Sequence, residues 1–296
     1  MTVSHQIAEL IVISGASTGM GAATARELAR RGYHVLAGVR RESDGERLAG
    51  PGLEPVLLDI TDPDQVAAIA QRVATDPQRR PLRALINNAG LAVNAPVEAL
   101  PLDDWRRVFE VNLFGHIAMT QALLPALHES RGRVVNISSV GGRVSLAAYG
   151  AYAGSKFAME AVSDALRREL GPRGVQVVVV EPGGVKTEMS NRGVANAAAI
   201  RDAMTEEHRR RYGDLMVAVM RHAEAFTEAG RPAEKAAEVI AKAATARCPR
   251  TRYTIGRDAA IFTRLSRVVP DRLLDRMTAR QLRAHYPAAT GGNAAR

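Results

Sequence analysis

The sequence contains one cysteine, only four lysines and few aromatic residues. Because Cys248 has no partner cysteine within the chain, no intrachain disulfide can form, which fits a reducing compartment. The N-terminus lacks a basic segment followed by a long apolar run, and no stretch of about 18 apolar residues occurs anywhere. We therefore expect no signal peptide and no integral membrane segment, and we interpret the protein as cytoplasmic.

Positive charge is in excess but unevenly distributed. The formal net charge is +9, and residues 201–296 hold 19 Lys and Arg against 11 Asp and Glu. A basic C-terminal part can contact nucleic acid, a membrane surface or an acidic substrate. Aromatic residues make up only 4% of the chain and no nucleic-acid-binding module is recognisable, so we expect no nucleic-acid partner. We interpret the excess as solvated surface.

Short apolar runs alternate with helical patterns in the first two thirds of the chain. The runs predict strands at residues 10–15, 33–39, 53–60, 82–88, 132–139 and 175–183. Long helices are predicted over 102–128 and 150–170. Strands this apolar are typical of a parallel sheet that is buried on both faces. The alternation predicts an α/β fold with a single doubly wound parallel sheet, the Rossmann fold.

The pattern changes after Pro182. Residues 184–230 are polar with weak periodicity, which favours a mobile lid over a site. A helix over 232–246 and a strand over 252–256 follow. We interpret 1–257 as the catalytic domain, 258–285 as a helical C-terminal extension and 286–296 as a disordered tail. The extension places four arginines on one helical face, which we expect in water, with a membrane-surface helix as the alternative: Arg272, Arg276, Arg280 and Arg283.

Glycines cluster where the first strand turns into a helix, in SGASTGMG (14–21). Gly15, Gly19 and Gly21 let the backbone approach a pyrophosphate, and the helix N-terminus offers free N–H groups. The spacing predicts a dinucleotide site, although glycines also serve ordinary tight turns.

Two tyrosines precede one lysine in YGAYAGSKFAME (149–160). A carbonyl that is reduced by hydride needs a proton, but a tyrosine pKa of about 10 is too high for easy proton exchange near neutral pH. A lysine four residues later on a helix lies on the same face and favours the tyrosinate form. Tyr152 has Lys156 at this offset, whereas Tyr149 has Ala153. We therefore predict that Tyr152 is the acid/base and that Lys156 lowers its pKa. Tyr149 is expected to line the pocket or to serve in packing.

Further motifs lie at the expected strand ends: NNAG (87–90), NISS (136–139), YAGSK (152–156) and PG (182–183). In this order the set resembles the short-chain dehydrogenase/reductase family over residues 8–190, and more loosely over 230–260. The C-terminal extension is similar to that of the steroid and retinol dehydrogenase branch. The resemblance implies an oxidoreductase that interconverts a ketone and a secondary alcohol with a nicotinamide cofactor, and it implies no metal.

The resemblance also assigns roles to residues. Ser139 would donate a hydrogen bond to the developing oxyanion, and Lys156 would also hold the nicotinamide ribose. Asn112 would complete a catalytic tetrad by fixing a water near Lys156, although a polar residue there also suits a helix kink. Ser14 stands where the family usually has threonine.

The cofactor contacts implied by the resemblance run from the glycine turn to the sixth strand. Asp59 and Ile60 would bracket the adenine, and Val185 and Thr187 would contact the carboxamide. The full set comprises Gly15, Ser17, Thr18, Gly19, Met20, Gly21, Arg40, Asp59, Ile60, Asn87, Ala89, Gly90, Tyr152, Lys156, Pro182, Gly183, Val185 and Thr187.

The end of the second strand predicts the form of the cofactor. Val39 stands where NAD-dependent enzymes carry an acidic residue for the ribose hydroxyls, and Arg40 follows it. A guanidinium can bind a 2′-phosphate in bidentate fashion. The sequence therefore predicts NADPH/NADP⁺ rather than NADH.

Small apolar residues after Ser139 suit a bulky apolar carbonyl compound, which by analogy with the branch would be steroid-, retinoid- or polyketide-like. A 3-oxoacyl group on a carrier protein or coenzyme A is the alternative substrate, because arginines near the C-terminus can meet phosphate. A cofactor-sensing regulator on the same fold is the alternative of another class. The resemblance implies a homodimer or homotetramer that pairs through the helices at 102–128 and 150–170.

Overall fold

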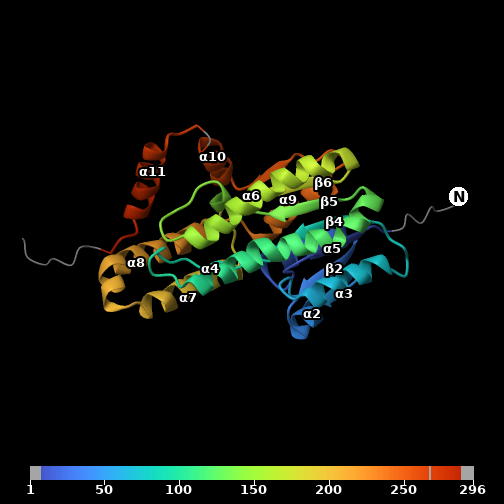
Figure 1. Ribbon diagram of the computed structural model, residues 1–296, viewed down its shortest axis with the longest axis horizontal. Helices are drawn as coiled ribbons and strands as arrows, with labels where there is room; N and C mark the ends of the chain where they lie inside the picture. Colours follow the sequence, from blue (N-terminus) through green and yellow to red (C-terminus); the bar gives the residue numbers. More distant parts are fainter. Residues whose placement is uncertain (1–7, 267, 288–296) are drawn as a thin grey trace, which may run out of the picture.

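The computed structural model describes residues 8–266 and 268–287, and a seven-stranded sheet forms its centre (Figure 1). Neighbouring strands are all parallel, in the order β3-β2-β1-β4-β5-β6-β7. The predicted doubly wound sheet is thus confirmed. The strands are β1 (Leu10–Ile13), β2 (His34–Val39), β3 (Leu53–Leu57), β4 (Leu82–Asn87), β5 (Arg133–Ile137), β6 (Gln176–Pro182) and β7 (Arg252–Ile255).

Helices cover both faces of the sheet. One face packs against α1 (Gly19–Arg30), α2 (Glu42–Leu48) and α9 (Ala233–Thr245), through side chains such as Leu28 and Ile240. The other face packs against α3 (Pro63–Ala74), α5 (Gly115–Ser130) and α6 (Gly150–Leu170), through side chains such as Met119 and Leu123. Strands β1 and β5 are buried between these layers. The burial of β1 on both faces explains its unbroken apolar sequence, LIVI.

The predicted helix over 102–128 is not continuous. It consists of α4 (Leu102–Phe109), a π-helical turn (Glu110–Phe114) and α5. A π-helical turn widens the helix locally and often marks a functional site. Asn112 lies inside this turn and is completely buried. The sequence had left a helix kink at Asn112 open, and the structure shows an irregular, π-helical turn there. The short helix α2 was not anticipated.

Residues 184–230 form two helices rather than a loosely structured segment. These are α7 (Glu188–Asp202) and α8 (Glu206–Glu228), whose N-termini are capped by the hydroxyls of Thr187 and Thr205. They share a small apolar cluster with the C-terminal extension, in which Ala197, Met216 and Leu282 are buried. Because most positions of α7 and α8 are not buried, the cluster produces no clear hydrophobic periodicity in the sequence. Whether the two helices move as a lid stays a prediction.

The C-terminal extension forms α10 (Arg257–Leu265) and α11 (Asp271–Arg283), which lie at the same end of the molecule as α8 (Figure 1). The four arginines of α11 are exposed, as predicted, while Leu282 is buried against α8. None of the helices in the described ranges is long and apolar enough to cross a membrane. Most of the predicted disordered tail, residues 288–296, lies outside the described residues.

A group of buried charges anchors the loop that follows β5. Arg143, in this loop, contacts Glu160 of α6 at 2.6 Å and Glu181 of β6 at 2.9 Å. Arg252 of β7 contacts Glu160 at 3.1 Å and Asp164 at 2.8 Å. Glu160 and Glu181 are almost fully buried. Buried carboxylates need paired cations. Arg143 therefore holds the loop to α6 and β6, and Arg252 helps to compensate the same carboxylates.

We predict that Arg143→Met destabilises the fold strongly. The variant leaves two buried carboxylates with one arginine, and breaking a buried pair costs about 3–5 kcal/mol. Arg106→Met is the matched control, because Arg106 pairs with Asp103 on the surface and exposed pairs contribute about 0–1 kcal/mol. Urea denaturation of both variants measures the difference, and equal losses would contradict the anchoring role.

Candidate active site

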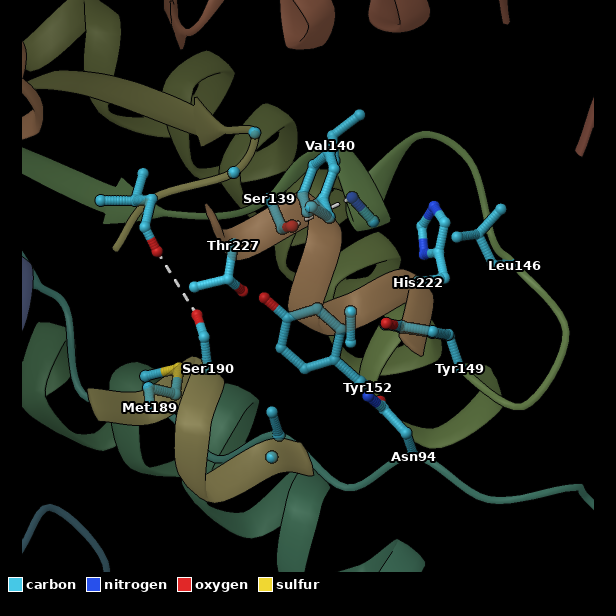
Figure 2. A pocket seen from close by; sticks show the side chains of 18 of the residues that line it. Asn94, Ser139, Val140, Leu146, Tyr149, Tyr152, Met189, Ser190, His222 and Thr227 are labelled. Carbon is cyan, nitrogen blue, oxygen red and sulfur yellow. Dashed lines mark hydrogen bonds between the residues drawn. The ribbon is translucent and has the colours of Figure 1, made fainter. Parts of the chain in front are cut away.

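A cavity of about 190 Å³ lies where the chain leaves β5 and β6. Its walls come from the loops after β4 and β5, the start of α6, and helices α7, α8, α10 and α11. Most of the lining is apolar, including Val144, Met189 and Phe226. Ser139 and Tyr152 lie on its wall, as Figure 2 shows. An apolar cavity with a few polar groups is typical of a small-molecule site.

Ser139 and Tyr152 meet because β5 ends next to the first turn of α6. The Ser139 hydroxyl accepts a hydrogen bond from the Gly141 N–H at 3.0 Å. Burial raises the pKa of Tyr152, and a hydrogen bond with Ser139 opposes this shift only in part. The phenol is therefore protonated at neutral pH, as a proton donor must be.

Lys156 lies one helical turn after Tyr152 and is buried. Its ammonium group donates a hydrogen bond to the Ile137 carbonyl at 2.9 Å and lies 5.9 Å from the centre of the Tyr152 ring. Burial lowers the pKa of Lys156 to about 8, while the nearby Glu160 acts in the opposite direction. The sequence analysis expected Lys156 to lower the pKa of Tyr152. In this structure burial outweighs any such effect, and the pKa of Tyr152 is raised.

Asn112 uses its side chain to hold the loop after β4. Its amide donates to the Leu91 carbonyl at 2.9 Å and to the Ser155 hydroxyl at 3.0 Å, and its oxygen accepts from the Leu91 N–H at 2.8 Å. Asn112 thus connects this loop to α6, one residue before Lys156. Its role in fixing a water stays a prediction.

The glycine turn fits a bound dinucleotide. A Cβ on Gly15 would lie 2.7 Å from the Ala89 Cα, and a Cβ on Gly21 would lie 2.1 Å from the Gly15 carbonyl oxygen. Only glycine permits these close approaches. The N-cap residue of α1, Thr18, makes no side-chain capping bond, and the first turn of α1 carries no acidic residue. Helix N–H groups without a capping side chain are suited to phosphate oxygens.

The NNAG motif is fastened to the glycine turn. The Ser14 hydroxyl accepts from the backbone N–H groups of Asn88 and Ala89, so the departure from threonine keeps the hydroxyl function. The Asn88 amide donates to the carbonyls of Ser14 and Gly15. Asn87 points into the core, where its amide donates to Asn136 at 2.9 Å. Its side chain is therefore a structural link between β4 and β5.

His116 supports the same motif from α5 and was not identified from the sequence. Its Nε2 lies 2.8 Å from the Ala89 carbonyl oxygen. Burial, with the nearby charge of Lys156, lowers the pKa of His116 to about 3, so the ring is neutral. The four-residue spacing between Asn112 and His116 could have indicated this supporting role, because residues four apart lie on the same face of a helix.

The remaining predicted cofactor residues lie around this turn. The Asp59 carboxylate accepts from the backbone and hydroxyl of Thr61, and Ile60 is buried against Gly115. A Cβ on Gly19 would lie 3.2 Å from the Thr187 side chain, so α7 begins beside the glycine turn. Three further predicted residues lie where β6 ends, and the last two of them line the cavity: Pro182, Gly183 and Val185.

Three arginines, at the end of β2, at the start of α2 and on α7, bear on the predicted binding of a 2′-phosphate. Arg40 is exposed at the end of β2, and within residues 8–266 and 268–287 it makes no ion pair. Arg41 is instead paired with Asp44 at 2.9 Å. Arg192 of α7, which the sequence analysis missed, lies 3.5 Å from the Thr18 hydroxyl while pairing with Glu188. It brings a positive charge next to the glycine turn (14–21), which contains no lysine or arginine.

Several cavity residues were also missed, since they come from elements far apart in the sequence. Asn94, His222, Phe226, Phe262 and Gln281 all line the cavity. None lies in a motif, so no local pattern could have identified them.

Comparisons with known proteins agree with this geometry. Residues 9–198 match the family of short chain dehydrogenases. The chain belongs to this family. Retinol dehydrogenase 5 of Mus musculus is 38% identical over 275 residues, which cover 90% of this chain and 86% of that protein. The protein is therefore an oxidoreductase of the ketone/alcohol type, and it resembles the retinol dehydrogenase-like branch of the family.

Two bacterial proteins extend the comparison. The NADPH-dependent 3-dehydrocapnine reductase of Ornithobacterium rhinotracheale is 30% identical over 92% of this chain and 96% of that protein. The crystal structure of a short chain dehydrogenase from Burkholderia cenocepacia, in complex with NADP, matches with a TM-score of 0.70 and 29% identity. The match covers 93% of this chain and 98% of that one. Both matches cover more than nine tenths of the chain and so extend beyond residues 9–198.

Proposed function

We propose that the protein is an NADP(H)-dependent oxidoreductase that interconverts a bulky apolar ketone and its secondary alcohol. The observation that carries this proposal is the convergence of Ser139 and Tyr152 on one wall of a mostly apolar cavity, with the ammonium group of Lys156 buried beneath the Tyr152 ring. A retinol dehydrogenase among the relatives supports an apolar substrate.

The catalytic roles follow from the protonation states. The bound nicotinamide supplies the hydride for reduction or accepts it in oxidation. Tyr152, protonated because it is buried, donates its proton to the substrate oxygen. Ser139 donates a hydrogen bond to the same oxygen as negative charge develops there. The positive charge of Lys156 stabilises the tyrosinate that remains.

The glycine turn and Arg40 would hold the cofactor. Gly15, Gly19 and Gly21 let the turn pack closely against Ala89 and Thr187 and against itself. The N-terminus of α1 then offers N–H groups to the pyrophosphate. Arg40 would bind the 2′-phosphate of NADP(H), and Arg192 would add positive charge from α7.

A cytoplasmic location and a homodimer or homotetramer are also part of this proposal. Phe114 and Phe157 are exposed, at 51% and 44%, on the helices through which the sequence analysis expects self-association. Large exposed aromatic side chains of this kind favour a contact surface.

We predict that Tyr152→Phe lowers kcat by roughly 10²–10⁴-fold, because only the proton donor is lost. Tyr149→Phe is the matched control, because Tyr149 lies three residues before Tyr152 at the start of α6. The decrease in kcat should be far smaller in this variant. Cofactor affinity, measured by fluorescence titration, should survive in both variants. If Tyr149→Phe proved the more damaging change with a reactive ketone, the assignment of the acid would be wrong.

We predict that the enzyme prefers NADPH over NADH by about 10- to 100-fold in kcat/KM, since a charged hydrogen bond contributes about 1.5–3 kcal/mol. Arg40→Ala should remove most of this preference. Arg26→Ala, which removes an exposed arginine from α1, is the control and should leave it unchanged. Similar kcat/KM values for both cofactors in the wild-type protein would refute the assignment. Val39→Asp is less informative, because Val39 is buried and a carboxylate there would destabilise the fold.

We predict that kcat/KM for ketone reduction falls as the pH rises through about 8. Below this pH Lys156 is protonated and stabilises the tyrosinate, whereas above it the charge is lost. In Lys156→Arg the cation stays charged at all these pH values, so the residual activity should not fall in this range. A wild-type profile that stays flat from about pH 7 to pH 9 would contradict this role of Lys156.

A further inference from the structure

The part of the cavity away from the reacting groups has polar side chains that hydride and proton transfer do not require. In Figure 2 the Tyr152 hydroxyl points to the side that carries Ser190, whereas Tyr149 and His222 lie on the other side, with Asn94 below them. We call Asn94, Tyr149 and His222 the distal wall. They come from the loop after β4, the start of α6 and α8.

His222 is held in one tautomer by the C-terminal extension. The Gln281 amide of α11 donates to Nε2 of His222 at 2.9 Å, so Nε2 accepts and Nδ1 carries the hydrogen. The ring stacks on Phe226, with 5.9 Å between centroids, and is only 5% exposed. Burial and the neighbouring His285 lower the pKa of His222, so the ring is neutral.

The Nδ1–H of His222 has no hydrogen-bond partner among the described residues. A buried donor without a partner is energetically unfavourable, because its desolvation is not compensated. The hydrogen bond to Gln281 and the stacking on Phe226 hold the ring in this orientation. A ligand atom in the cavity is therefore the natural acceptor.

Asn94, in the loop after β4, also carries a buried polar atom without a hydrogen-bond partner among the described residues. It is 6% exposed, its Oδ1 has no partner in the described part of the chain, and it lines the cavity. The Tyr149 hydroxyl completes the wall. Burial raises the pKa of Tyr149 to about 12, so this group stays protonated and can donate.

We propose that the distal wall binds a second oxygen function of the substrate, a carbonyl or hydroxyl group that an apolar skeleton holds apart from the carbonyl reacting at Tyr152. This inference rests on the proposed ketone reduction and specifies its substrate class. A carbonyl oxygen accepts from His222 and Tyr149, and a hydroxyl can in addition donate to Asn94. Gln281 acts as a positioning residue, since it sets which His222 nitrogen carries the hydrogen.

The experiment compares two probes with one carbon skeleton: a saturated steroid diketone and the monoketone that lacks the distal oxygen. The wild-type enzyme, assayed with NADPH, should favour the diketone by about tenfold in kcat/KM, because one hydrogen bond contributes about 1 kcal/mol or slightly more. The preference should appear mainly in KM, since the distal contact is equal in ground and transition states.

Three variants test the wall itself. His222→Phe keeps the stacking on Phe226 but removes the donor, Asn94→Leu removes the amide, and Gln281→Leu frees the tautomer. In each variant the kcat/KM for the diketone, divided by the kcat/KM for the monoketone, should fall towards one. His208→Phe, on the same helix but directed at Glu98, is the control and should keep the wild-type ratio.

The outcomes separate the two proposals. If neither probe reacts while other ketones do, the steroid-sized substrate class and this inference both fail. If no ketone or alcohol reacts, the proposed function itself fails. If both probes react equally and the variants leave the ratio unchanged, only the distal wall is refuted, and its polar groups hold water alone.

Discussion

The buried ammonium group of Lys156 is the constraint on which the candidate site depends. A lone cation is costly in an apolar interior, and burial lowers the pKa of Lys156 to about 8. Two features keep it charged near neutral pH: the Ile137 carbonyl at the end of β5, and Glu160 one turn further along α6. Glu160 is itself held by Arg143 and Arg252. Lys156 is therefore linked electrostatically to the loop that follows Ser139 and to strands β6 and β7. Through Lys156 the same charges act on Tyr152.

The cofactor half and the substrate half of the site are connected through the loop after β4. Asn88 bonds this loop to the glycine turn, and Asn112 bonds it to α6 through Ser155. His116 fastens its middle at the Ala89 carbonyl. Rigid placement of both halves is what hydride transfer demands, because small errors in the position of the reacting atoms cost rate steeply. The π-helical turn at Asn112 puts this side chain where it can reach both elements.

The distal wall gives the C-terminal extension a role beyond covering the fold. Its helix α11 exposes the arginines that dominate its sequence, but turns Gln281 and Leu282 inward. Leu282 joins the apolar cluster of α7 and α8, and Gln281 orients His222. The same helix that docks the extension thus also shapes the chemistry of the cavity. In the proposed distal wall, Gln281 acts from a position 98 residues after the last family motif, PG at 182–183.

The sequence by itself determined the parallel sheet, the glycine turn and the Ser139, Tyr152 and Lys156 set. Buried strands need continuous apolar runs, and motifs at strand ends are local, so both are readable in order along the chain. Only the tertiary structure decided the direction of the Tyr152 pKa, because burial is a property of the packed site. It also decided the core position of Asn87, the approach of Arg192 to Thr18 and the distal wall. These depend on contacts between residues far apart in the sequence, which periodicity and spacing do not encode.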